Sequence, residues 1–148
     1  MKILIAFALV FVAACSGPNG SQSNASAPAA PVIEGEQGEA RIAAVLSYAD
    51  WCSSCKILDP KLTAVKAGAA IPGVQYVTID YTDKNADSFF AGADAAGVGP
   101  AVREKFDGEV KTGLLLIVNL ETGQLVDTLT KTVSEEELRA ALENAAAV

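Results

Sequence analysis

The stretch Trp51-Cys52-Ser53-Ser54-Cys55-Lys56 follows directly after the apolar run of residues 42–48. It marks the point at which a strand pattern changes into a helix pattern. In a helical turn, residues three apart lie on one face, so the sulfurs of Cys52 and Cys55 can come close enough to form a disulfide. The sequence therefore predicts a dithiol that opens and closes reversibly at the start of a helix.

The two cysteines are predicted to have different roles. If the helix begins near Ser53, Cys52 lies beside unpaired N–H groups and the positive end of the helix dipole, which stabilise a thiolate. The thiolate is the attacking form of cysteine, so Cys52 is the expected nucleophile. Cys55 lies one turn deeper, and we expect it to attack second and release a partner from a mixed disulfide with Cys52.

Composition limits the remaining classes of function. The chain has 148 residues, 51% of them apolar and 20% charged, which fits one globular domain. Its net charge of −7 disfavours binding to nucleic acid. Histidine is absent, which excludes a Ser/His or Cys/His nucleophile pair and a His-ligated metal. Two thiolates supply only half of a tetrahedral metal site, so we predict no metal and no other cofactor besides the disulfide itself.

The first 14 residues predict an export signal. Lys2 carries a positive charge, residues 3–14 are uncharged and almost wholly apolar, and Val12-Ala13-Ala14-Cys15 ends the run with small residues. Residues 3–14 are too few to span a bilayer, which needs about 20 residues. If Cys15 belongs to the export signal, the other two cysteines, Cys52 and Cys55, are left to pair with each other. A disulfide between them can persist in an exported protein.

The sequence Val12-Ala13-Ala14-Cys15 resembles the lipobox of bacterial lipoproteins. This resemblance implies that Cys15 becomes the first residue of the mature protein and carries lipid, which anchors it to a bilayer. Ser16 in place of aspartate favours the outer membrane over the inner one, by similarity to the sorting rule of enterobacteria. The alternative is an ordinary secretory signal. Residues 15–39, rich in Gly, Ser, Pro, Asn, Gln and Ala, are predicted to be a flexible linker after the lipidated cysteine.

Residues 40–148 are predicted to form the folded domain. Apolar runs predict strands over residues 42–48 and 114–120, and the turns at residues 71–73 and 121–123 lead into predicted strands over residues 74–80 and 124–129. Helices are predicted over residues 53–69, 86–96 and 101–106, and a last helix runs to residue 146. Ser134 and Glu137 form the capping box of that last helix. The order β-α-β-α-β-β-α predicts an α/β fold with a mixed sheet flanked by helices.

Over residues 40–148 the sequence resembles the thioredoxin superfamily. The resemblance rests on Trp51-Cys52-Ser53-Ser54-Cys55-Lys56, on Pro60 five positions beyond the second cysteine, and on the order of the elements. Tyr48-Ala49-Asp50-Trp51-Cys52 and Asp80-Tyr81-Thr82-Asp83 are similar to the C-terminal thioredoxin-like domain of DsbD proteins. The resemblance to the thioredoxin superfamily implies a thioredoxin-like fold and the activity of a thiol–disulfide oxidoreductase. Cys52 is then the nucleophile, Cys55 the resolving thiol, and Trp51 and Lys56 are supporting residues. Trp51 is implied to serve in packing and docking.

The sequence departs from the superfamily pattern at three positions around the dithiol. Thr112 stands where the superfamily has a cis-proline, and we expect a trans Lys111–Thr112 peptide because a cis bond before threonine costs about 2.5 to 4 kcal/mol. The Thr112 hydroxyl is then a candidate hydrogen-bond partner of a sulfur. Leu46 and Thr78 replace the buried aspartate and lysine of the pattern. Asp50 is the candidate acceptor for the proton of the resolving thiol, or simply a solvated loop residue.

The sequence thus favours a membrane-tethered periplasmic thiol–disulfide oxidoreductase of the bacterial cell envelope. We expect it to act on exported proteins with thiols or disulfides, as a reductant rather than an oxidant. A reductant needs an upstream thiol electron donor, because exported thiols tend to oxidise. The main alternative is a non-catalytic lipoprotein interaction module on the same scaffold. Two further alternatives are a permanent structural disulfide and a metal site completed by a second chain or by exogenous ligands.

Overall fold

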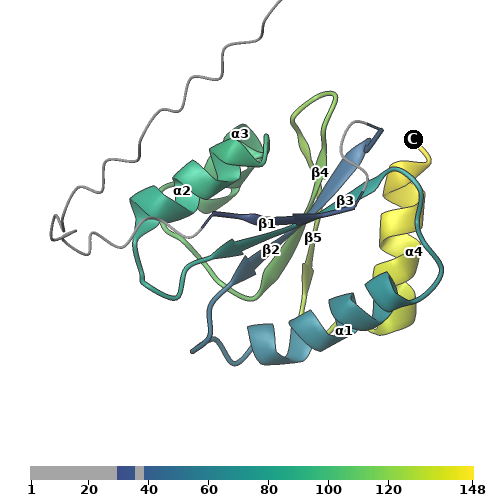
Figure 1. The fold of residues 1–148 in the computed structure, drawn as a ribbon, viewed down its shortest axis with the longest axis horizontal. Coiled ribbons are helices and arrows are strands. Elements are labelled where there is room, and N and C mark those ends of the chain that lie inside the picture. The colour runs from purple at the N-terminus through teal and green to yellow at the C-terminus, as the bar shows by residue number, and fades with distance from the viewer. Residues whose placement is uncertain (1–29, 36–38) are drawn as a thin grey trace, which may run out of the picture.

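Five strands form one mixed sheet in the part of the chain that the computed structural model describes, residues 30–35 and 39–148 (Figure 1). In chain order the elements are β1 (Val32–Glu34), β2 (Ile42–Tyr48), α1 (Cys55–Ala67), β3 (Val74–Asp80), α2 (Ala86–Ala95), α3 (Gly99–Phe106), β4 (Leu114–Asn119), β5 (Leu125–Thr130) and α4 (Glu135–Ala146). The order in the sheet is β1-β3-β2-β4-β5. The α/β fold class is therefore confirmed, in an arrangement consistent with a thioredoxin-like fold.

β2 is the central strand, and its side chains contribute to a hydrophobic core on each face of the sheet. It pairs parallel with β3 and antiparallel with β4. Its alternate side chains Ile42, Ala44 and Leu46 belong to one buried cluster, which includes residues of α1 and α4. Ala43 and Val45 belong to the other, which includes residues of α2 and α3. Figure 1 shows α1 and α4 on one side of the sheet and α2 and α3 on the other.

Most predicted boundaries hold to within one residue. Strands β2 and β3 have the predicted limits, and α4 begins with the predicted capping box of Ser134 and Glu137. Two helices differ more. The predicted helix over residues 53–69 begins instead at Cys55 and ends at Ala67, and it contains Pro60 in its interior. α3 begins at residue 99, two residues before the predicted start, because Val98 already accepts the first helical hydrogen bond, from Val102.

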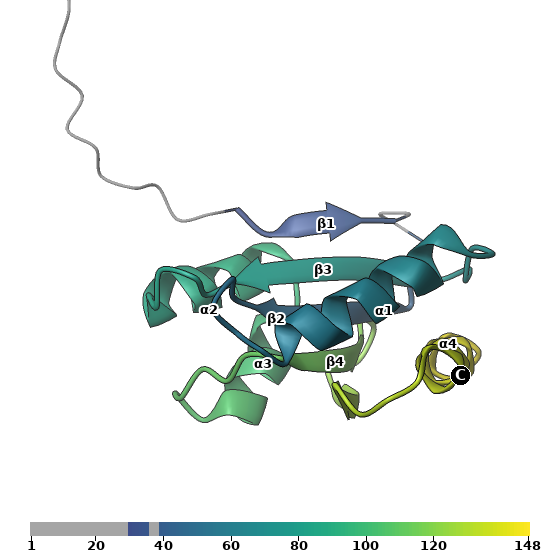
Figure 2. The ribbon, with the colours of Figure 1, turned by 90° about the horizontal axis from the view of Figure 1, so that it is seen from below.

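β1 is an element that the sequence analysis did not predict. Residues 32–34 were assigned to the flexible linker, and the structure corrects this: they pair antiparallel with β3, with Ile33 opposite Val77. Ile33 packs against the core cluster under α2 and α3. Glu34 forms an ion pair with Lys66 of α1. Figure 2 shows β1 lying alongside β3 at the edge of the sheet.

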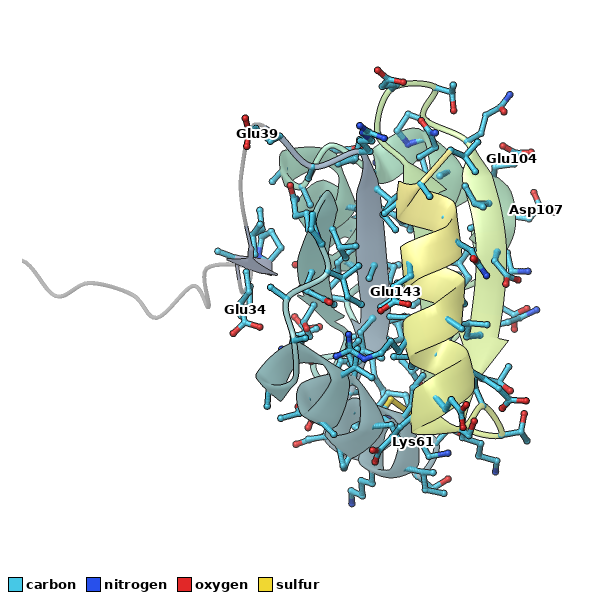
Figure 3. The ribbon with its side chains drawn as sticks, turned by 90° about the vertical axis from the view of Figure 1, so that its right-hand side faces the viewer. Glu34, Glu39, Lys61, Glu104, Asp107 and Glu143 are labelled. Atoms are coloured by element: carbon cyan, nitrogen blue, oxygen red, sulfur yellow. A yellow bond between two sulfur atoms is a disulfide. The ribbon has the colours of Figure 1, made fainter. Side chains whose placement is uncertain are left out.

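Long side chains fix α1 against the C-terminal part of the fold. Lys61 Nζ donates to the carbonyl oxygen of Val133, at 2.6 Å, in the connection between β5 and α4. From α4, Arg139 donates to the carbonyl oxygens of Val65, at 2.9 Å, and Ala69, at 3.0 Å. The Val65 carbonyl lies in the last turn of α1 and the Ala69 carbonyl lies just beyond it, so the cation is placed at the negative end of the helix dipole. Figure 3 shows Lys61 where α1 and α4 lie close together.

The predicted signal over residues 1–14 and the predicted lipidation at Cys15 lie outside the described residues. Within residues 30–35 and 39–148, no helix has both the length and the apolar character needed to cross a bilayer.

Candidate dithiol site

Cys52 and Cys55 form a disulfide where β2 leads into α1. Their Cα atoms are 5.3 Å apart, within the range that the bond requires. The bond appears in yellow in Figure 3, below the end of the sheet. Both residues belong to a small buried cluster with Ala49, against which Tyr48 packs. The pairing expected from the three-residue spacing is thus present in the structure.

Cys52 has the surroundings of a helix N-terminus, as the sequence predicted. Its sulfur accepts a hydrogen bond from the backbone N–H of Cys55 at 3.1 Å. Its carbonyl oxygen accepts one from Lys56 at 3.3 Å. The N-cap residue of α1 is Ser54, and the Cys52 sulfur and carbonyl accept the N–H groups of the first two helical residues. A donor directed at the sulfur stabilises the thiolate form.

Cys55 has the opposite environment. It is completely buried, whereas Cys52 is 6% exposed. Its sulfur lies 3.6 Å from the carbonyl oxygen of Ser47. A carbonyl oxygen only accepts, so in the reduced protein this contact favours the thiol over the thiolate. The pair is therefore asymmetric: Cys52 is slightly exposed and its sulfur faces a donor, whereas Cys55 is fully buried and its sulfur faces an acceptor.

Trp51 lies beside Cys52 and is held by the loop that follows β3. Its Nε1 donates to the carbonyl oxygen of Thr82 at 3.1 Å, and the backbone N–H of Asp50 donates to Thr82 Oγ1 at 3.1 Å. The Tyr81 ring meets Trp51 edge to face at 6.4 Å, and the ammonium of Lys84 lies 5.2 Å from the Trp51 ring centroid. Trp51 nevertheless remains 47% exposed. It is fixed in place and also available to a partner.

The structure places the predicted proton acceptor Asp50 and the supporting residue Lys56 on the surface. Sequence reasoning missed a second acid, Asp59, which is only partly exposed and lies four residues after Cys55 in α1. Side chains at this spacing are neighbours on a helix, with Cβ atoms about 5 to 6 Å apart. The i,i+4 spacing was the signal that could have identified Asp59.

Gly113, the residue after the predicted Thr112, closely approaches the dithiol. A Cβ atom on Gly113 would lie 3.2 Å from Cys52 Sγ and 2.5 Å from the Cβ of Ser54, so only glycine fits there. Gly113 also has a φ of +81°, which glycine adopts without strain. The described residues contain no cis peptide, so the expected trans Lys111–Thr112 bond is confirmed. The hydrogen bonds found for the two sulfurs do not include the Thr112 hydroxyl.

No Asp, Glu, Lys or Arg side chain is buried in the part of the chain that the structure describes. Leu46 and Thr78, at the positions of the superfamily's aspartate and lysine, are direct partners across β2 and β3. Among the described residues the buried polar side chains are Ser47 and Gln75. The buried acid and base of the superfamily pattern therefore have no counterpart among the described residues. The described residues also contain no cluster of three or more Cys, His, Asp or Glu side chains able to hold a metal ion.

The chain has a structural likeness among solved proteins, and none among family models or curated proteins. Among solved structures, the chain is similar to the crystal structure of Trxlp from Edwardsiella tarda EIB202, with a TM-score of 0.46 and 23% sequence identity. The alignment covers 71% of this chain and 84% of that chain.

Proposed function

We propose that this protein is a thiol–disulfide oxidoreductase that acts through the Cys52–Cys55 pair. The observation that carries the proposal is the asymmetry of the two sulfurs. Cys52 accepts the Cys55 N–H and is 6% exposed, while Cys55 is fully buried against the Ser47 carbonyl. This arrangement suits one sulfur to attack partners and the other to attack only a neighbour.

In the reducing direction, the thiolate of Cys52 attacks a disulfide of the partner. A bond forms between Cys52 and one partner sulfur, and the other partner sulfur leaves as a thiolate that takes up a proton. Cys55 then loses its proton and attacks Cys52 Sγ, the mixed disulfide breaks, and the second partner sulfur leaves as a thiolate that takes up a proton. The partner gains two electrons, and this protein is left with the Cys52–Cys55 disulfide. An upstream thiol donor must reduce it before the next cycle.

The small exposure of Cys52 defines how a partner must bind. Cys52 is 6% exposed, and its neighbour Trp51, which is fixed by the Thr82 loop, is 47% exposed. We propose that partners are exported proteins that place a disulfide or thiol against this surface. We propose that the protein reduces its partners. Its proposed location is the bacterial cell envelope, where lipid on Cys15 anchors it to the outer membrane and the folded domain faces the periplasm.

An insulin-reduction assay with the full chain in detergent micelles tests the activity. We expect turnover above the rate with dithiothreitol alone, and we expect both Cys52→Ser and Cys55→Ser to abolish the excess. Cys55→Ser should also accumulate a mixed disulfide through Cys52, which a gel without reductant detects. In the reduced protein, iodoacetamide at neutral pH should label Cys52 well before Cys55, because only Cys52 has an exposed surface.

The alternative function is a non-catalytic interaction module. The observation that favours it is the altered backbone at Thr112 and Gly113, together with a closed disulfide whose sulfurs are both largely covered. Insulin reduction no faster than with dithiothreitol alone, with no mixed disulfide in Cys55→Ser, would favour this alternative and reject the enzyme.

A further inference from the structure

Ser47 is the unexpected polar residue beneath the dithiol. It is 1% exposed and lies in β2, which is otherwise apolar along its buried length. Its hydroxyl accepts the N–H of Leu114 at 3.2 Å and donates to the carbonyl oxygen of Leu114 at 3.1 Å. Its backbone carbonyl accepts the N–H of Gly113 at 2.8 Å and lies 3.6 Å from Cys55 Sγ. One residue therefore binds both β4 and the buried sulfur.

The conformation of Gly113 explains why a hydroxyl is needed at this position. Along a regular antiparallel strand, successive N–H groups point in opposite directions, so two in a row cannot both bond to one neighbouring strand. The φ of +81° at Gly113 breaks this alternation. The N–H groups of Gly113 and Leu114 both point toward residue 47. The Ser47 carbonyl satisfies the first and the Ser47 hydroxyl satisfies the second.

The hydrogen bonds of Ser47 affect the two sulfurs because they hold Gly113 in place. The Gly113 backbone packs so closely on Cys52 and Ser54 that no Cβ fits between them. When the disulfide is reduced, its sulfurs must separate from bonding distance, about 2.05 Å, to van der Waals contact. Cys55 is fully enclosed, so Cys52 Sγ has to move, and Gly113 limits the space available to it.

We infer that Ser47 is a positioning residue that sets the thiol–disulfide equilibrium of the Cys52–Cys55 pair. By holding Gly113 and Leu114 against β2, its hydroxyl restrains the separation of the sulfurs and so favours the disulfide over the dithiol. This inference rests on the proposed redox function and names one residue that tunes it. Ser47 does not touch the substrate, and its effect is on the equilibrium of the pair.

Equilibration with glutathione tests the inference on the full chain in detergent micelles. In this reaction two glutathione molecules reduce the pair to two thiols and leave as one glutathione disulfide, and trapping with an alkylating reagent gives the dithiol fraction. Ser47→Thr retains the hydroxyl, whereas Ser47→Val introduces a side chain of the same shape as threonine but without a hydroxyl. We expect Ser47→Val to favour the dithiol by about threefold to tenfold relative to Ser47→Thr, because the Leu114 hydrogen bonds are lost.

Asn119→Ala is the matched control for a loss of stability alone. Its side chain also makes two hydrogen bonds to backbone, from the N–H groups of Glu121 and Thr122, both at 2.9 Å. It stands at the other end of β4, about 17 Å along the strand from Leu114 at 3.4 Å per residue. We expect it to lower the free energy of unfolding and leave the glutathione equilibrium unchanged.

Equal equilibrium constants for Ser47→Thr and Ser47→Val, or a shift toward the disulfide in Ser47→Val, would overturn the inference. An equal shift in Asn119→Ala would overturn it as well. Ser47→Ala, whose smaller side chain fits the same space, provides the measurement if the valine variant does not fold. If the unaltered protein fails to equilibrate with glutathione at all, the proposed function fails; if it equilibrates and the variants do not differ, only the role of Ser47 fails.

Discussion

Replacing Gly113 with alanine tests the packing around the dithiol most directly. The substitution imposes two separate costs. A left-handed conformation with φ of +81° costs a residue with a Cβ about 1 to 2 kcal/mol. The Cβ would also lie 2.5 Å from the Cβ of Ser54 and 3.2 Å from Cys52 Sγ, and such overpacking typically costs about 1 to 3 kcal/mol. We therefore expect Gly113→Ala to lower the free energy of unfolding by about 2 to 5 kcal/mol.

Gly108 supplies a matched control for the backbone term. Its φ is +82°, and a Cβ placed on it meets nothing within 4 Å. Gly108→Ala should therefore cost only the backbone term, about 1 to 2 kcal/mol. Urea unfolding of the oxidised proteins, followed by far-UV circular dichroism, measures the loss of unfolding free energy in each variant. The variants are compared with one common value for the dependence of the unfolding free energy on urea concentration. If Gly113→Ala loses no more stability than Gly108→Ala, the close approach of Gly113 to the dithiol is refuted.

Three further predictions concern other parts of the chain. Arg139→Ala should lower the free energy of unfolding by about 1 to 2 kcal/mol in urea, because the cation at the C-terminal end of α1 and its carbonyl hydrogen bonds are lost. Hydrogen bonds from the backbone and hydroxyl of Ser134 lower the pKa of Glu137 in the folded protein. The ionised side chain therefore stabilises the fold fully above the unfolded-state pKa of about 4.3, and this stabilisation is lost as the pH falls through the lower pKa of the folded state. Glu137→Gln should reduce the loss of stability between pH 7 and pH 3, and an unchanged pH profile would contradict this assignment. In the native envelope, Cys15→Ser should abolish incorporation of labelled fatty acid and move the protein from the membrane to the soluble fraction; continued labelling would reject lipidation at Cys15.

The parts of the fold that the sequence predicted are those with a strong local signal. The apolar run of β2 and the turn before β3 predicted the correct limits of these strands, and the capping box of α4 predicted its start. β1 was missed because only three residues form it, at the end of a segment whose composition is typical of linkers. Its stability comes from pairing with β3 and from Ile33 packing on a core that is built by residues far along the chain. No local pattern carries that information.

The same distinction divides the candidate site. Cys52 receives its hydrogen-bond donor from Cys55, three residues away, so the six-residue motif alone was enough to predict this contact. The surroundings that act on the equilibrium come from elsewhere: Gly113 packs on Cys52 only after β4 has paired with β2, and Ser47 binds residues 66 and 67 positions further along the chain. A glycine before an apolar strand and a serine within one are common, and neither indicates a site by itself. Chains that share the motif should therefore share the nucleophile and still differ in redox equilibrium, since that equilibrium depends on which residues the sheet brings against the two sulfurs.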